Sequence, residues 1–231
     1  MKIFNLEKRF DRFHLLIDEL ELLDGKIYGF IGSNGCGKTT AAKIMAGLLK
    51  ADGGVIDYEG LTPREITMVS RKPYMLHDTV MKNLAYPLSL RKIKPDKEVI
   101  EHYLEMAGLQ DMRESYAPSL SAGEQQKLSL IRALIFSPKL IFIDEAFSNL
   151  DIESLAAFEN FILDKQKKEP VTWVMINHQL SHIRRMCDYV FFMYKGRIEA
   201  CGTREEIFYK TENEKLKEYF QYETLDSAVG G

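Results

Sequence analysis

The sequence predicts an α/β fold in which a mostly parallel sheet is flanked by helices, because of two features of its apolar pattern. Four apolar runs are nearly continuous, which is typical of parallel strands covered on both faces. The segments between them carry apolar residues at spacings of three and four, as amphipathic helices do. We therefore expect strands at 26–31, 139–143, 171–176 and 189–194, and helices at 37–49, 121–136, 151–166 and 203–210.

Two other regions depart from this alternation. Residues 71–120 contain helical segments that begin near Thr79 and Pro95 and end at Gly108, with no clear strand. We interpret them as a helical subdomain inserted into the sheet domain. Short segments in the N-terminal third predict a separate antiparallel β layer, at 2–7, 13–20, 53–58 and 66–69.

The composition describes a globular protein of 231 residues, of which 45% are hydrophobic, enough for a substantial core. Its 31 Lys and Arg against 34 Asp and Glu give a formal net charge of −3, so the chain lacks the basic surplus that nucleic-acid binding requires. Three cysteines with no CxxC pair favour a reducing compartment, the cytosol. Because no 18 apolar residues run together, we expect any work at a membrane to need another chain that spans it.

The strongest motif follows the first long apolar run and precedes a helical pattern, and it reads Gly32-Ser33-Asn34-Gly35-Cys36-Gly37-Lys38-Thr39-Thr40. It fits the G-x-x-x-x-G-K-[ST] pattern of phosphate-binding loops. Glycines let the backbone wrap around an anion, so that successive N–H groups point at phosphate oxygens. Lys38 adds a positive charge for the β- and γ-phosphates, and the Thr39 hydroxyl can ligate Mg²⁺. The flanking strand and helix disfavour the alternative, a glycine-rich turn that binds nothing.

Two carboxylates, Asp144 and Glu145, follow the apolar run that ends at Ile143. Open α/β sheets bind ligands at the carboxyl ends of their strands. Asp144 therefore suits Mg²⁺, directly or through water, and Glu145 suits a base that polarises the attacking water. Alone, the pair would more simply be loop carboxylates or a helix cap, but a complete phosphate loop in the same chain makes that the weaker interpretation.

His178 follows the next apolar run, where an imidazole can contact a γ-phosphate. It forms an H-x-x-x-H pair with His182, which invites a zinc interpretation. Gln179 stands where a zinc protease has its glutamate, however, and no third ligand is evident. A solvated histidine at a helix start is the more serious alternative.

Ser121 and Glu124 precede a long amphipathic helix at the spacing of a capping box. A capping box accounts for the helix start without any ligand. Ser121 and Gly123 at an exposed helix N-terminus would also form a second anion site, so the chain carries two helix starts suited to phosphate.

In their order along the chain, these motifs resemble the ATP-binding subunit of ABC transporters, over about residues 3–210. The similar segments are 32–40 for Walker A, 120–124 for the signature, 140–145 for Walker B, 148–151 for the D-loop and His178 for the switch histidine. Phe10 stands where the family has an aromatic residue that stacks on adenine. Phe13 is the other candidate, and either can be a core residue.

The resemblance implies an ABC-type P-loop NTPase core with ATP and Mg²⁺ as cofactors. It implies one ATP-binding domain over 1–231, with 1–70 and about 125–231 as the core and about 71–124 as the helical subdomain. The implied catalytic residues are Glu145, His178 and Lys38, and the implied metal ligands are Thr39 and Asp144. The implied nucleotide contacts are Phe10, Gly32, Ser33, Asn34, Gly35, Cys36, Gly37, Lys38, Thr39, Thr40, Ser121 and Gly123.

The resemblance also implies partners. In the family, two subunits form a head-to-tail homodimer, in which the signature serine and glycine, here Ser121 and Gly123, close on the ATP held by the other subunit. The helical subdomain docks on a membrane permease, and importers add an external solute-binding protein. Pro73 to Leu76 form an aromatic and apolar cluster where the family accepts a permease helix, although such a cluster can equally be core.

The sequence departs from the family pattern at the Q-loop, where Arg71 replaces the family's glutamine. A guanidinium has only donors and cannot ligate Mg²⁺. We expect Ser70 or a water to take the metal position while Arg71 pairs with a phosphate or a carboxylate; the alternative is that Arg71 turns into solvent. Ala122 and Glu124 replace the first Gly and the Gln of the signature, and we expect activity to survive both changes.

Cys36 lies within the phosphate loop beside a helix N-terminus, a position where cysteines are often reactive. That environment predicts inactivation by thiol reagents with protection by ATP. The interpretation that we favour is a small residue that fills a small space, because burial makes cysteines inert.

We therefore expect an ATPase subunit, cytoplasmic and peripheral on the inner face of the membrane, that hydrolyses ATP and passes the motion to a permease. One alternative is a soluble ABC-type ATPase that is not coupled to transport. Another is a nucleotide-binding regulator with little turnover, which the missing Q-loop glutamine motivates.

Overall fold

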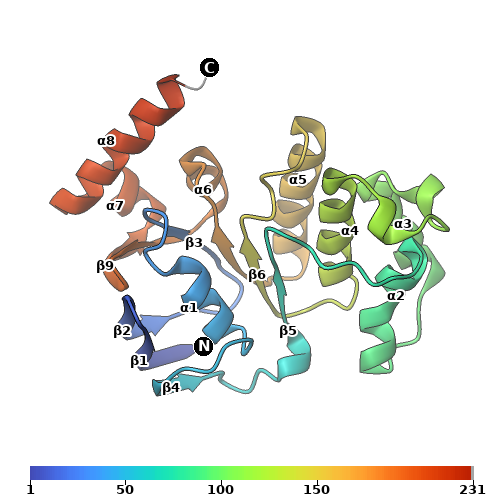
Figure 1. Cartoon of the computed structure of the whole chain (residues 1–231), viewed down its shortest axis with the longest axis horizontal. Helices are drawn as coiled ribbons and strands as arrows, with labels where there is room; N and C mark the ends of the chain where they lie inside the picture. Colours follow the sequence, from blue (N-terminus) through green and yellow to red (C-terminus); the bar gives the residue numbers. More distant parts are fainter. Residues whose placement is uncertain (230–231) are drawn as a thin grey trace. The chain divides into compact units, whose positions relative to one another are not determined.

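The computed structural model describes residues 1–229, and these form two compact units. Unit 1 combines Met1–Glu59 with the segment from Thr172 onward, and unit 2 is Gly60–Val171. Each unit contains strands covered by helices, and unit 1 adds an antiparallel sheet, so the α/β fold with a mostly parallel sheet and an antiparallel layer is confirmed (Figure 1). The extents of the ATP-binding domain and of its helical subdomain stay predictions.

The antiparallel sheet of unit 1 has the strand order β2-β1-β4, with bounds Phe13–Glu21, Lys2–Phe10 and Gly53–Asp57. Ile3 pairs with Leu20 on one side and with Ile56 on the other. Ile3 and Leu20 are buried, so this sheet turns an apolar face inward. Three of the four segments expected in an antiparallel layer are therefore confirmed.

The remaining strands of unit 1 place the phosphate loop. Strand β3, Ile27–Ile31, lies between the parallel strands β7, Thr172–Ile176, and β8, Tyr189–Tyr194. Every residue of β3 and β7 is buried, as their continuous apolar sequences predict. Strand β9, Arg197–Thr203, adds antiparallel to β8 as a hairpin that the sequence analysis did not predict.

The helices of unit 1 follow these strands. Helix α1 spans Lys38–Met45 directly after the phosphate loop. Helices α6, Leu180–Met186, and α7, Arg204–Tyr209, follow β7 and β9, and α8, Glu214–Val229, comes last. Thr203 and Glu206 form a capping box at the start of α7.

Unit 2 contains the parallel strands β5, Ile66–Val69, and β6, Leu140–Asp144. The assignment of 66–69 to the antiparallel layer was therefore wrong. A four-residue strand does not reveal its partner by its own pattern, and β5 pairs Val69 with Ile143 in parallel register.

The helices of unit 2 are α2, Val80–Arg91; α3, Lys97–Ala107; α4, Ala122–Leu134; and α5, Ile152–Lys168. Helix α2 begins just after Thr79 and α3 ends at Gly108, as predicted. The side chain of Thr79 caps α2, and Gly108 has the left-handed conformation. Helix α4 packs against both α2 and α3 (Figure 1). Within residues 1–229, no helix combines the length and apolarity that a membrane crossing requires.

Candidate functional site

The phosphate loop leaves the buried end of β3 and leads directly into α1. Gly32 and Gly35 have φ values of 139° and 75°, and Gly37, the N-cap of α1, has a φ of 114°. L-residues with a side chain rarely adopt such angles. The loop therefore has the folded-back path that turns backbone N–H groups toward an anion.

The surroundings of two of these glycines leave no room for a side chain. A Cβ on Gly32 would lie 2.1 Å from the backbone oxygen of Met193, and one on Gly37 would lie 2.8 Å from Cζ of Phe13. A Cβ on Gly35 would meet no atom within 4 Å. The loop is thus seated against β8 and β2, with Gly35 at its open tip.

Lys38 folds back over this loop. Its Nζ donates hydrogen bonds to the backbone oxygens of Gly32, at 2.5 Å, and Ser33, at 3.1 Å. The side chain is only 6% exposed, so a positive charge is held within the loop by its own carbonyls. If an anion binds there, Lys38 can exchange its carbonyl partners for a group with a full negative charge, which interacts more strongly with an ammonium.

The other loop residues differ in exposure. Ser33 and Asn34 are exposed, and Thr39 and Thr40 lie half-buried in the first turn of α1. Cys36 is buried, with its Sγ 3.7 Å from Nζ of Lys38. This burial supports the interpretation of Cys36 as a small residue that fills a small space.

His178 lies at the same edge of the sheet as the phosphate loop. Strands β3 and β7 are parallel neighbours, with Phe30 paired to Ile176, so both end at this edge. His178 comes two residues after Ile176 and precedes α6, which begins at Leu180 and contains His182. The two histidines therefore do not share the helical face that an H-x-x-x-H zinc pair requires.

Phe10 and Phe13 face each other at the tip of the β1–β2 hairpin, with ring centroids 6.3 Å apart. Phe13 covers Gly37, whereas Phe10 is 48% exposed. An exposed ring in the same unit as the phosphate loop can take a nucleobase on its face. Phe13 has a packing role that the sequence alone left open.

Unit 2 presents the acidic pair at the end of β6. Asp144 is the last strand residue and is buried. Glu145 has a φ of 52°, an uncommon conformation for a residue with a side chain, and its backbone oxygen accepts a hydrogen bond from Oγ of Ser148 at 2.9 Å. Backbone strain of this kind clusters at functional sites.

Arg71 forms an ion pair with Glu145, at 3.1 Å between Nη1 and Oε2. Arg71 was expected to pair with a phosphate or a carboxylate, and in this structure its partner is a carboxylate. The Arg71 side chain is nevertheless 65% exposed, so part of it faces solvent, which was the alternative expectation.

Ser121 is the N-cap of α4, and the predicted capping box is confirmed. Ser121 Oγ donates to Oε2 of Glu124 at 2.6 Å, and the Glu124 N–H donates back to Oγ at 3.3 Å. The hydroxyl and the backbone N–H of Ser121 both donate to the Glu124 carboxylate, and these two hydrogen bonds lower its pKa. A Cβ on Gly123 would lie 3.2 Å from the backbone oxygen of Asn149, so the helix start also lies close to segment 148–151.

Comparisons with known proteins agree with this combination of a phosphate loop, strand-end carboxylates and a capped helix start. The ABC transporter family model matches residues 17–148. The chain is 34% identical to the tungstate uptake system ATP-binding protein of Peptoclostridium acidaminophilum, covering 87% of this chain and 97% of that protein. The chain belongs to the ABC transporter family.

Two further comparisons describe the extent of the likeness. A sulfate/thiosulfate import ATP-binding protein of Neisseria meningitidis is 32% identical over 94% of this chain, which spans 65% of that protein's length. A solved structure of an ATP binding subunit of an ABC transporter superposes with a TM-score of 0.82 at 23% identity, covering 96% of this chain and 98% of that one. This last likeness shows the fold.

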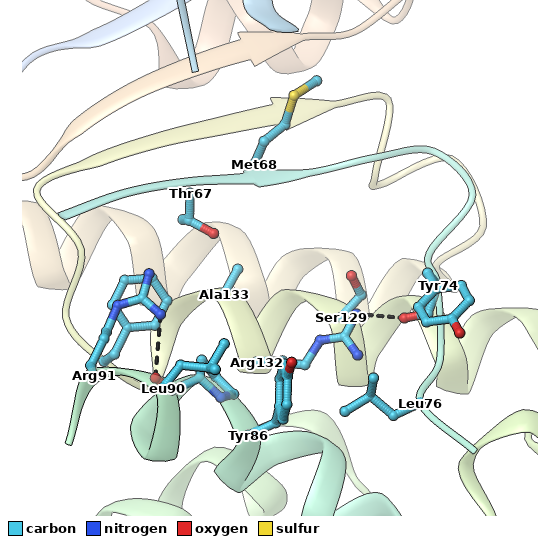
Figure 2. A pocket seen from close by; sticks show the side chains of 12 residues that line it. Thr67, Met68, Tyr74, Leu76, Tyr86, Leu90, Arg91, Ser129, Arg132 and Ala133 are labelled. Carbon is cyan, nitrogen blue, oxygen red and sulfur yellow. Dashed lines mark hydrogen bonds between the residues drawn. The ribbon is translucent and has the colours of Figure 1, made fainter. Parts of the chain in front are cut away.

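The ABC transporter chain also has a groove of about 270 Å³ in unit 2. Figure 2 shows Tyr86 and Leu90 of α2 and Arg132 of α4 around it, together with Tyr74 from the segment after β5. Tyr74 is 71% exposed, so at least this residue of the cluster at 73–76 is not core, although Met75 is buried. The groove residues are Thr67, Met68, Tyr74, Leu76, Tyr86, Pro87, Leu90, Arg91, Ser129, Arg132, Ala133 and Phe136.

Polar contacts fix the rim of this groove. Nη2 of Arg132 donates to the backbone oxygen of Tyr74 at 2.7 Å, and its Nη1 donates to Oδ1 of Asn83 at 3.1 Å. The Arg91 guanidinium stacks 3.5 Å above the ring centroid of Phe136. The sequence analysis did not identify these two arginines. Their partners are far away in the sequence, and the packing of α2 beside α4 brings them together.

Proposed function

We propose that this chain binds and hydrolyses ATP to power solute uptake through a separate membrane permease. ATP hydrolysis coupled to transport follows from its family. The observation that carries the proposal is the phosphate loop, with three glycines at positive φ and Lys38 folded over its carbonyls. Both relatives described above have uptake or import in their names, which supports the inward direction.

In this proposal, the loop holds the ATP phosphates and Phe10 stacks on the adenine. The backbone N–H groups of Gly32 to Thr40 bind phosphate oxygens, and Lys38 leaves its carbonyl partners to bind the β- and γ-phosphates. The exposure of Phe10 and the packing of the half-buried Phe13 against Gly37 support Phe10 over Phe13 for the base.

We assign Mg²⁺ binding to Thr39 and Asp144. A hydroxyl in the first turn of a helix and a carboxylate at a strand end are the oxygen donors that Mg²⁺ prefers. When bound, the metal ion neutralises the charge that develops on the phosphates. Burial restricts the movement of the Asp144 side chain, and the position of Thr39 in α1 fixes its backbone.

We assign water activation to Glu145 and γ-phosphate contact to His178. A carboxylate at a strand end can accept a hydrogen bond from the attacking water and orient it. A Glu145→Gln variant should bind ATP with the affinity of the original chain, by calorimetry, but release no phosphate. A Lys38→Ala variant, in contrast, should bind ATP more weakly than the original chain. Retained turnover in Glu145→Gln would rule out the base assignment.

We also propose a head-to-tail homodimer, in which Ser121 and Gly123 close on the ATP of the partner. Support comes from the capped N-terminus of α4, a 13-residue helix whose first N–H groups can bind a phosphate oxygen. The Glu145→Gln variant should dimerise with ATP and separate without it, in analytical ultracentrifugation.

The groove between α2, α4 and the 74–76 segment is our proposed docking site for a permease helix on the inner face of the membrane. Exposed aromatic and apolar side chains beside a hollow suit an amphipathic helix. Tyr86→Asp should abolish capture by the permease but leave ATP affinity unchanged, whereas Val55→Asp, an equally drastic change at an exposed position on β4, should affect neither.

One observation favours a second candidate, a nucleotide-binding regulator with little turnover. The ion pair with Arg71 occupies the carboxylate that hydrolysis needs. A phosphate-release assay on the purified chain and on the permease complex separates the two functions. Membrane co-purification separates both from an ABC-type ATPase that is not coupled to transport.

A further inference from the structure

The contact between Arg71 and Glu145 is a consequence of strand register. Val69 and Ile143 form the last pair of the parallel strands β5 and β6. Arg71 and Glu145 each come two residues after that pair, so the two chains emerge abreast. The backbone therefore directs this cation to this carboxylate.

The two partners differ in freedom. Glu145 is 15% exposed and its backbone is fixed by Ser148, whereas Arg71 is 65% exposed. An ion pair with one partner so exposed is weak, because water screens it and the long side chain loses entropy when it is held. The guanidinium can therefore leave a carboxylate that stays in place.

The chemistry of the guanidinium restricts what it can do there. It has five donors and no acceptor, so it can neither bind a metal ion nor accept a proton from water. Its partners are anions, and it binds phosphate as well as carboxylate. While Nη1 contacts Oε2 of Glu145, that oxygen is engaged by a donor other than the attacking water.

We propose that Arg71 is a latch on Glu145, which lowers the basal turnover of this subunit by occupying the carboxylate. An anion that binds the guanidinium in place of Glu145 removes this donor from Oε2. Arg71 is a positioning residue in this account, since it acts through Glu145. The proposal rests on the assignment of Glu145 as the base.

The test compares Arg71→Ala and Arg71→Gln with the original chain by steady-state ATP hydrolysis. Loss of a weak ion pair should raise kcat about two- to five-fold and leave KM within about two-fold. Arg71→Lys keeps the charge and should stay close to the original rate. Lys72→Ala removes the neighbouring exposed cation and should change neither parameter.

A second measurement needs no turnover. Urea unfolding of Arg71→Ala, Glu145→Gln and the double variant forms a cycle, in which the ion pair predicts a non-additive effect of about two- to five-fold on the unfolding equilibrium constant. Strict additivity would mean that the pair does not form in solution and would overturn the latch.

The outcomes also distinguish failure of the latch proposal from failure of the assignment of Glu145 as the base. If Glu145→Gln is inactive but both Arg71 variants have an unchanged or lower kcat, the latch is wrong and the base assignment stands. If Glu145→Gln keeps its turnover, the base assignment itself fails. A higher kcat for Arg71→Ala that Arg71→Lys does not show supports the latch.

Discussion

Replacing Gly32 with alanine should destabilise the chain by about 2–5 kcal/mol. The positive φ of 139° alone costs an L-residue about 1–2 kcal/mol. The new Cβ would lie 2.1 Å from the backbone oxygen of Met193, and forcing an extra carbon into a packed site adds about 1–3 kcal/mol. Because the obstacle is backbone rather than a flexible side chain, the loop itself has to move.

Gly35→Ala is the matched control for this change. Gly35 also has a positive φ, of 75°, but its Cβ would meet no atom within 4 Å. It should therefore cost only the backbone part, about 1–2 kcal/mol. Urea unfolding of both variants, with ATP affinity measured by calorimetry, gives the comparison. Equal losses of unfolding free energy would refute the argument that β8 seats the loop.

Three further predictions concern other parts of the chain. Phe10→Ala should weaken ATP binding about ten-fold in calorimetry without changing the unfolding midpoint, since base stacking contributes about 1–3 kcal/mol; unchanged affinity would remove Phe10 from the site. Glu124→Gln removes the negative charge that accepts from Ser121, so ATP-driven dimerisation should strengthen in ultracentrifugation, and weaker association would contradict this. Hydrogen bonds from Lys139 and from the N–H and hydroxyl of Thr62 lower the pKa of Glu65 from 4.5 to about 2, so the stability that this carboxylate adds is complete above pH 4.5 and is lost as the pH falls toward 2. Glu65→Gln should therefore melt below the original chain at pH 7 and approach it near pH 2, and a constant difference in Tm would show that the pair contributes nothing.

Continuous apolar runs made the central strands predictable. Strands β3 and β7 are buried on both faces, so almost every residue is apolar, and runs this short favour a strand over a buried helix. Strand β9 shows the opposite case. Its residues are half-buried or exposed, and only its hairpin with β8 defines it as a strand.

The site was predictable where chemistry is local in sequence. The capping box of Ser121 and Glu124 needs only residues three apart, and the loop that contains Lys38 needs only a contiguous motif. The partner of Arg71 depends instead on the register between β5 and β6, and β5 was assigned to the wrong sheet. Contacts across strands therefore required the structure.

The segment after β5 touches Glu145 at one end and lines the groove at the other. Only two residues separate Arg71 from Tyr74, whose carbonyl is held by Arg132. Suppose that a helix bound in the groove weakens the ion pair between Arg71 and Glu145 by some factor. Thermodynamic reciprocity then requires that loss of this ion pair change the affinity of the groove for the helix by the same factor. Permease affinity measured on Arg71→Ala would then report the strength of the coupling without any ATP being consumed.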